Sequence, residues 1–77
     1  MKANTSVESA ITRSISHNAI VRVNVPDKAS QTEALEDVSR MDKVAWCDYA
    51  GENDGSLDVW GTTEAGDEFR LRIAVRA

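Results

Sequence analysis

The stretch LDVWGTTEAGDEFRLRIAV, residues 57 to 75, predicts a β-hairpin and thereby decides the fold. It holds two runs in which apolar or small residues alternate with polar ones, so each run should form a strand with one face toward a core. The core-facing residues would be Leu57, Val59, Gly61 and Thr63 in the first run and Phe69, Leu71, Ile73 and Val75 in the second. A short loop containing Gly66 joins them, which makes the pair antiparallel.

The requirement that apolar residues share one face also limits the register of this hairpin. We expect Thr63 to lie opposite Phe69, with a loop from Glu64 to Glu68. The same register sets Gly61 against Leu71, Val59 against Ile73 and Leu57 against Val75. On the other face it places Thr62 beside Arg70, Trp60 beside Arg72 and Asp58 beside Ala74, with Arg72 and Arg76 as diagonal neighbours of Asp58.

Upstream of the hairpin, helical and extended patterns alternate. One helix is predicted from Ser6 to Ser16, with a capping box at its start from Thr5 to Glu8. A second is predicted from Gln31 to Met41, with a capping box from Ser30 to Glu33. Their apolar stripes are Val7, Ala10, Ile11, Ser14 and Ile15, and Ala34, Leu35, Val38 and Met41. His17 and Asn18 suit the end of the first helix. Strands are predicted over 19–25, ended by Pro26, and over 44–49.

The element order α-β-α-β-β-β predicts a single α+β domain spanning residues 1–77. Two helices should cover one face of a four-stranded sheet, and the last three strands should form an antiparallel meander because their links are short. Consecutive turns of a meander lie at opposite ends, so the loops around Gly55 and Gly66 should not meet. The first strand has two possible positions, beside the second or beside the last.

Charge and composition narrow the class of protein. Thirteen acidic and nine basic residues give a net charge of −4, which disfavours direct binding to nucleic acid or to an anionic membrane. The sequence has no secretory signal and no apolar run of membrane-spanning length, so a cytoplasmic location is expected. Cys47 is the only cysteine, which excludes an internal disulfide and favours a buried, inert thiol.

Nothing in the sequence matches a known catalytic or cofactor motif. Cys47 and His17 have no surrounding nucleophile signature, and core packing and helix capping account for them better. The glycines follow no phosphate-binding pattern, and neither acidic loop fits EF-hand spacing. We therefore expect no enzyme, no cofactor and no metal site.

A protein-binding surface is the better hypothesis, and it has two forms. In the first, carboxylates imitate nucleic-acid phosphates; in the second, Trp60 with Arg70 and Arg72 forms an interface hot spot. The alternatives for Trp60 are a cation–π pair with no partner, or a homodimer contact. The carboxylates that complete the predicted partner-binding set are Asp48, Glu52, Asp54, Asp58, Glu64, Asp67 and Glu68.

A small acidic α+β domain without a catalytic set, with the hairpin LDVWGTTEAGDEFRLRIAV, resembles the anti-CRISPR inhibitors carried by phages and mobile elements. The resemblance implies a stoichiometric inhibitor that binds a CRISPR effector complex and blocks recognition of target DNA. It carries no residue assignment, because these inhibitors share no motif. The alternatives are an immunity or antitoxin-type module that neutralises a basic protein, and a structural accessory domain of a phage particle. DNA binding by Arg70, Arg72 and Arg76 ranks last.

Overall fold

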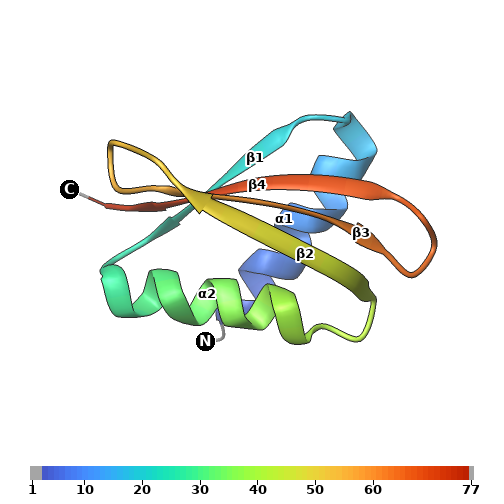
Figure 1. The fold of residues 1–77 in the computed structure, drawn as a ribbon, viewed down its shortest axis with the longest axis horizontal. Helices are drawn as coiled ribbons and strands as arrows, with labels where there is room; N and C mark the ends of the chain where they lie inside the picture. Colours follow the sequence, from blue (N-terminus) through green and yellow to red (C-terminus); the bar gives the residue numbers. More distant parts are fainter. Residues whose placement is uncertain (1–2, 77) are drawn as a thin grey trace.

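The computed structural model describes residues 3–76, with side chains from Val7 onward. Its elements follow the expected order α-β-α-β-β-β and confirm the α+β class (Figure 1). They are α1 (Ala3–His17), β1 (Ile20–Val25), α2 (Lys28–Arg40), β2 (Val44–Gly51), β3 (Leu57–Thr63) and β4 (Glu68–Val75).

The four strands form one mixed sheet in the order β1-β4-β3-β2. The pairs β2–β3 and β3–β4 are antiparallel, as predicted for the meander. β1 lies beside the last strand and runs parallel to it, with Ile20 opposite Arg70 and Val25 opposite Val75. A parallel pair requires a long crossover, and α2 with the meander supplies it. The two edges of the sheet are therefore β1 and β2.

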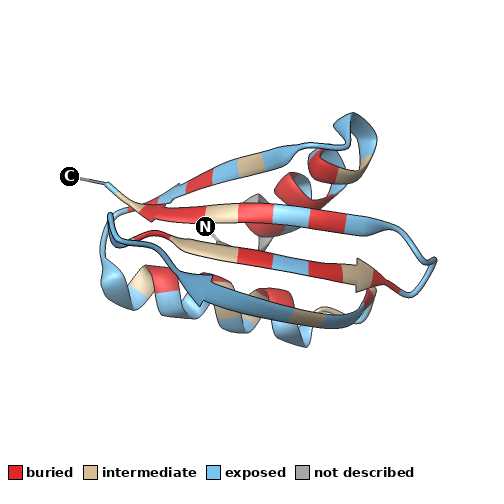
Figure 2. Ribbon diagram, turned by 45° about the horizontal axis from the view of Figure 1, so that its top comes forward, coloured by how far each residue is buried: buried red, intermediate tan, exposed pale blue. Residues whose placement is uncertain are grey.

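Both helices cover the same face of the sheet, and the core lies between the two layers (Figures 1 and 2). From Glu68 to Ile73 of β4, buried residues alternate with exposed or intermediate ones, since a strand presents successive residues to opposite faces (Figure 2). The largest fully buried side chains are Phe69, Ile11, Leu71 and Ile73. One hydrophobic core thus holds the chain together.

The stripe predicted for α1 is confirmed, with Val7, Ala10 and Ile11 fully buried. The predicted start is wrong: the helix already includes Ala3, so Thr5 lies inside it rather than at a cap, and its side chain lies outside the described part. The helix ends at His17, one residue later than predicted, and Asn18 after it adopts a φ of 51°, the left-handed conformation expected there.

Ser14 links α1 to β4 and to the turn that precedes β1. Its hydroxyl donates to the carbonyl oxygen of Ala19 at 2.7 Å and accepts the backbone N–H of Arg70 at 2.8 Å. Ser14 is 2% exposed, so these bonds satisfy a buried hydroxyl that would otherwise be costly. The position of β1 against β4 is therefore fixed partly by a residue that the apolar stripe alone does not explain.

The start predicted for α2 is also wrong, because the helix begins three residues before Gln31, at Lys28. Asp27 is the N-cap: its backbone is extended, and its carboxylate accepts the Ser30 N–H at 2.8 Å. This hydrogen bond holds the pKa of Asp27 below its usual value. The residues read as a second capping box are consequently part of the helix.

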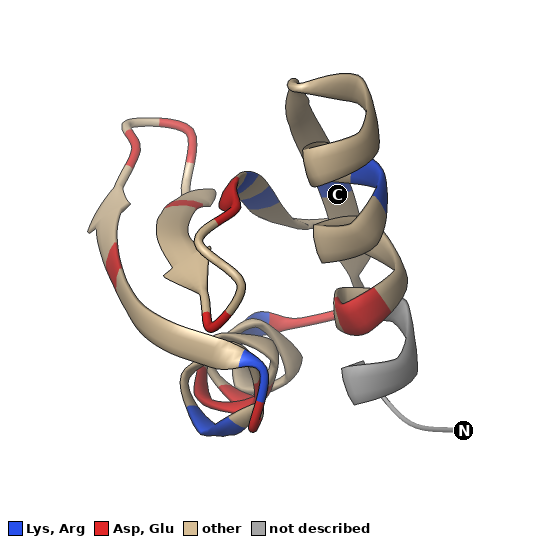
Figure 3. Ribbon diagram, turned by 90° about the vertical axis from the view of Figure 1, so that its right-hand side faces the viewer, with Lys and Arg blue, Asp and Glu red and all other residues tan. Residues whose placement is uncertain are grey.

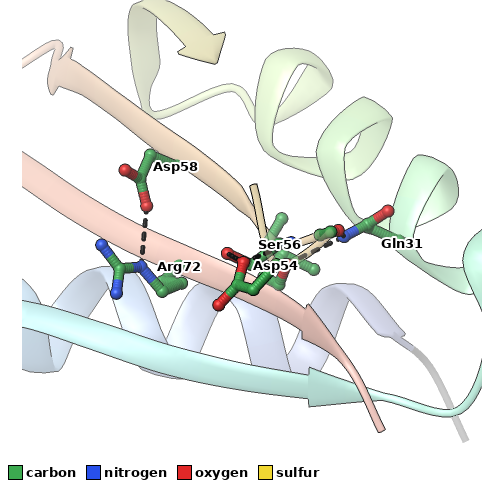
Figure 4. Close-up of polar contacts among 7 residues, drawn as sticks. Gln31, Asp54, Ser56, Asp58 and Arg72 are labelled. Carbon is green, nitrogen blue, oxygen red and sulfur yellow. Dashed lines mark hydrogen bonds and ion pairs between the residues drawn. The ribbon is translucent and has the colours of Figure 1, made fainter. Parts of the chain in front are cut away.

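Gln31 in the first turn of α2 is 4% exposed and binds two backbone carbonyls (Figure 4). Its Nε2 donates to Gly55 at 2.9 Å and to Ile73 at 3.0 Å. Gly55 belongs to the β2–β3 turn and Ile73 to β4, so one amide connects a helix, a turn and a strand. The turn on which Asp54 lies is thereby attached to the core.

The hairpin register differs from the prediction by two residues. Thr62 lies opposite Glu68, Trp60 opposite Arg70 and Asp58 opposite Arg72, whereas Thr63 had been expected opposite Phe69. The turn is tighter than expected, because the Thr63 N–H bonds the Asp67 carbonyl at 2.9 Å and Gly66 has a φ of 91°. A shift of two leaves every side chain on its predicted face, so the alternation pattern cannot detect it.

Candidate functional site

The sheet face turned away from both helices is uncovered, and we call it the open face. Paired residues of neighbouring strands point to the same side, so the register identifies its members. They are Ile20, Arg22 and Asn24 of β1, Glu68, Arg70, Arg72 and Ala74 of β4, Asp58, Trp60 and Thr62 of β3, and Trp46, Asp48 and Ala50 of β2.

Three of the four exposed large hydrophobic side chains in the described part of the chain lie on the open face. Trp46 is 54% exposed, Ile20 52% and Trp60 36%. They come from β2, β1 and β3, so the sheet collects them from strands far apart in sequence. The fourth, Tyr49, points to the helix side of β2. Exposed aromatic side chains gathered on one face of a small domain indicate a binding surface.

Charge on the open face is divided between the two halves of the sheet. Arg22 on β1 and Arg70 and Arg72 on β4 make one half basic, although Glu68 lies at the end of that half. Asp58 on β3 and Asp48 on β2 make the other half acidic. The face thus offers both signs of charge around its aromatic residues, which suits a partner of mixed charge.

Trp60 lies at the centre of this face, opposite Arg70 on β4 and Asp48 on β2. The sequence prediction placed it beside Arg72; the two-residue change of register explains the difference. Two shallow hollows flank the indole, one of about 230 Å³ shared with Trp46 and Arg70, and one of about 180 Å³ shared with Ile20 and Arg70. A partner side chain can therefore contact Trp60 from either side.

Asp58 and Arg72 form the ion pair of the open face (Figure 4). The Arg72 Nε donates to Asp58 Oδ1 at 2.9 Å, and the two side chains are 38% and 27% exposed. The prediction made them diagonal neighbours, whereas they are directly opposed. This hydrogen bond lowers the pKa of Asp58 and raises that of Arg72. Half-exposed pairs of this kind contribute little stability.

The β2–β3 turn adds two carboxylates at this end of the face. Asp54 accepts the backbone N–H and the hydroxyl of Ser56, at 3.0 and 2.7 Å, and these bonds hold its pKa low (Figure 4). Glu52 faces Asp58, and the hydrogen bond and charge of that carboxylate raise the pKa of Glu52. Asp54 is thus used in shaping the turn, while Glu52 remains available.

The contribution of the Asp58–Arg72 pair to the stability of the fold should depend on pH. Because the folded-state pKa of Asp58 lies below its unfolded value, the pair stabilises the fold above the unfolded pKa, and this contribution is lost as pH falls through the folded value. We expect Asp58→Asn to lower the free energy of unfolding at neutral pH by less than about 1 kcal/mol. Relief of the repulsion on Glu52 offsets part of that loss.

The measurement is urea unfolding of wild type and Asp58→Asn from neutral pH to below about pH 4, where unperturbed carboxyls protonate. The difference between the two proteins should shrink toward the acid end. Asp42→Asn, which removes a carboxylate from the exposed turn before β2, is the control. If the stability difference between wild type and Asp58→Asn grew as the pH fell, the stabilising role of the Asp58–Arg72 pair would be contradicted.

The remaining predicted carboxylates do not gather into one acidic surface. Glu64 and Asp67 lie in the β3–β4 turn, and Glu52 and Asp54 in the β2–β3 turn at the other end of the sheet (Figure 1). The expectation that the two loops stay apart is confirmed. Acidic positions are spread around the molecule rather than concentrated on one side (Figure 3). The arrangement disfavours a continuous imitation of phosphates.

Cys47 is half-buried on the helix side of β2, less enclosed than the sequence reading supposed. Burial, and to a smaller extent the charge of Asp48, raises the pKa of its thiol, which lowers its reactivity. Among residues 3–76, no group of three or more His, Cys, Asp or Glu side chains is placed to hold a metal ion. Neither helix of the described part is long and apolar enough to span a membrane.

Sequence reasoning missed the residues that β1 adds to the open face, among them Ile20 and Arg22, and it missed Trp46 of β2. In β1, Ile20 and Arg22 alternate with valines, so their shared face was available from the pattern. Trp46 lies in a strand for which no side was predicted. The proximity of these residues to Trp60 and Arg70 depends on strand order, which the sequence left open.

Comparisons with known proteins add no relatives to this description. The chain matches no protein-family model, no curated protein and no solved structure.

Proposed function

We propose that this protein is a protein-binding inhibitor that docks on its partner through the open face. The observation that carries the proposal is the collection of Trp46, Trp60 and Ile20, all exposed, on the sheet face that neither helix covers. Tryptophan and arginine dominate interface hot spots, and Trp60 lies directly opposite Arg70.

A protein partner fits this face better than a nucleic acid. Asp48, Asp58 and Glu68 share the open face with the arginines, so a polyanion would meet carboxylates at several positions of the same surface. Binding driven by phosphate contacts needs a positive footprint, and the net charge of −4 opposes it. A protein surface with its own mixture of charges can pair with both halves of the face.

Of the two forms of inhibitor expected from the sequence, the hot-spot form is the one we propose. The carboxylates of the first form are scattered over two turns at opposite ends of the sheet and over the strands β2 and β4; they are Glu52, Asp54, Glu64, Asp67, Asp48 and Glu68. The partner class comes from the resemblance to anti-CRISPR proteins: a CRISPR effector complex in the cytoplasm of the host, bound stoichiometrically so that target DNA is not recognised.

The test is a pulldown with the tagged chain from bacterial lysates containing CRISPR effector complexes, followed by titration of the purified complex. Replacing Trp60 and Arg72 together with Ala should weaken binding by at least about a hundredfold, since each residue belongs to a class that can contribute 2 kcal/mol or more. Circular dichroism should show that the double variant remains folded, because both side chains are largely outside the core.

The matched control reverses charge in the distant turn with Glu64→Lys and Asp67→Lys. Binding within about threefold of wild type is expected there, because rim charges change affinity little. Loss of binding in the turn variant with full binding by the face variant would contradict the hot-spot form. Recovery of no effector subunits would contradict the anti-CRISPR role, and stoichiometric recovery of a basic toxin would replace it with an immunity module.

A further inference from the structure

The edge strand β2 carries little of the protection that edge strands normally have. Exposed edges are usually blunted by Lys, Pro or covering segments. The other edge, β1, carries Arg22 and is followed by Pro26, whereas Val44–Gly51 contains no Lys, Arg or Pro. Its one charged residue is Asp48, and a bulge interrupts the register between Val44 and Trp46. From Trp46 onward the strand is regular and its outer side is open.

The hydrogen bonds of the β2–β3 turn show which amides of β2 point outward. The Glu52 N–H bonds the Ser56 carbonyl at 2.8 Å, so Glu52 and Ser56 form a hydrogen-bonded pair. Such pairs alternate along an antiparallel ladder, so the N–H groups of Ala50 and Asp48 also face β3. It follows that the N–H groups of Cys47, Tyr49 and Gly51 point away from the sheet.

One of these outward amides already has a replaceable partner. The Tyr49 N–H donates to Asp48 Oδ1 at 2.8 Å, a bond between neighbouring residues at the exposed edge. The carboxylate occupies the place that the carbonyl of an added strand would take. Displacing it costs little, because both groups are exposed to water, and it frees Asp48 to pair with a cation.

A hollow of about 370 Å³ lies beside this edge, between β2 and α2. Leu35 and Thr32 line it from the helix, and Cys47 and Tyr49 from the strand. Tyr49 is 55% exposed there, so its ring stands at the side of the hollow rather than in the core. An apolar depression next to unused strand amides is the arrangement that strand-addition sites use to bind peptides.

Acidic groups border the same hollow. Glu36 and Asp48 both line it, and Arg40 holds Glu36 through a pair 3.4 Å long whose side chains are 69% and 59% exposed. Exposed helix pairs of this kind are weak, so Glu36 can exchange partners. Within the described chain the lining contains no basic residue. The border of the groove is therefore complementary to Lys or Arg.

We propose that β2 and this groove form a second binding site, which takes an extended peptide segment of a protein partner as a fifth strand. The segment carries an apolar side chain that enters the hollow beside Leu35 and Tyr49, flanked by Lys or Arg side chains that pair with Glu36 and Asp48. Its backbone bonds the outward amides of Cys47, Tyr49 and Gly51. The site uses the edge and helix side of the sheet and shares only Asp48 with the open face.

The experiment titrates the full chain, labelled with ¹⁵N, with a short synthetic peptide in which valine and lysine alternate. The amide signals of Cys47, Tyr49 and Gly51 should shift, and their hydrogen exchange should slow as they become bonded. The same peptide with glutamate in place of lysine should bind at least about tenfold more weakly, because it meets Glu36 and Asp48 with like charge. N-methylation of the peptide amides that face β2 should abolish binding.

Protein variants locate the site. Tyr49→Ala should weaken binding of the lysine peptide by about tenfold, which is a usual effect of removing one aromatic side chain from an interface. Trp46→Ala removes an equally exposed ring from the same strand but from the open face, and should change this affinity by less than about twofold. The proposal is overturned if the shifts map to the open face, if the glutamate peptide binds equally well, or if light scattering shows β2 paired with a second copy instead.

Discussion

Gly61→Ala is expected to be among the most destabilising single substitutions in this protein, lowering the free energy of unfolding by about 3 kcal/mol or more. A Cβ on Gly61 would collide with the carbonyl oxygen of Trp46 and lie 2.9 Å from the Cα of Cys47. Both are backbone atoms of the neighbouring strand β2, so no side-chain rotation relieves the clash. The pair β2–β3 must separate locally to admit even a methyl group.

Gly51→Ala is the matched control for this prediction. It is on the same strand pair and the same side of the sheet, yet its Cβ would meet only Leu57 Cδ2 at 4.0 Å, an ordinary contact. We expect the control to alter stability by less than about 1 kcal/mol, with a slight gain from the loss of unfolded-state freedom. Urea unfolding followed by circular dichroism measures both variants, and equal stabilities would refute the close approach at Gly61.

Phe69→Ala is expected to lower the free energy of unfolding by about 4 kcal/mol. Phe69 is 1% exposed and heads the fully buried side chains by volume. A domain of 77 residues has a total stability on the order of 4 to 11 kcal/mol. The substitution should therefore remove between about a third and all of the stability of the domain.

Thermal and urea unfolding of Phe69→Ala measure this effect against the exposed neighbour Glu68. Glu68→Ala should change stability by about 0.5 kcal/mol or less, because its side chain leaves no cavity in the core. Phe69→Leu should lie between the two, since it retains most of the buried apolar volume. A Phe69→Ala protein as stable as Glu68→Ala would mean that the space closes around the missing ring.

Strand faces were predictable from the sequence, while strand partners were not. Alternation along residues 57–75 fixes which side chains face the helices, and Phe69, Leu71 and Ile73 are buried as expected. The same alternation is unchanged when one strand slides by two residues, so it could not place Trp60 opposite Arg70. The turn decided the register, through a hydrogen bond between Thr63 and Asp67 that composition alone does not reveal.

The start of α2 shows a second limit of sequence reasoning. Two potential caps stand close together, Asp27 and Ser30, and the box pattern favoured Ser30. The structure uses Asp27 because the extended chain after Pro26 places its carboxylate against the Ser30 N–H. An earlier start adds a turn and brings Gln31 over Ile73 and Gly55. A local sequence pattern can indicate several possible N-cap residues, and the packing of the whole domain determines which of them is used.

The candidate site was predictable only in part, because the sequence indicates which residues of one hairpin lie close together but not the order of all the strands. Trp60 and its arginines belong to one hairpin, so they could be found from local pairing. Ile20 reaches this surface only because β1 docks against β4, and Trp46 only because β2 forms the far edge. Neither placement follows from neighbouring residues.

The parallel pairing of β1 with β4 has a consequence for how the chain folds. The meander can assemble from neighbouring segments, but β1 must wait for the last strand, since Ile20 pairs with Arg70. Closing so long a loop is entropically costly and slows folding. Until it closes, Val23 and Val25 have no β4 to pack beside, and the hairpin alone has no helix α1 over Phe69. Because each half leaves core-facing residues uncovered, we expect the sheet to form late and in one cooperative step.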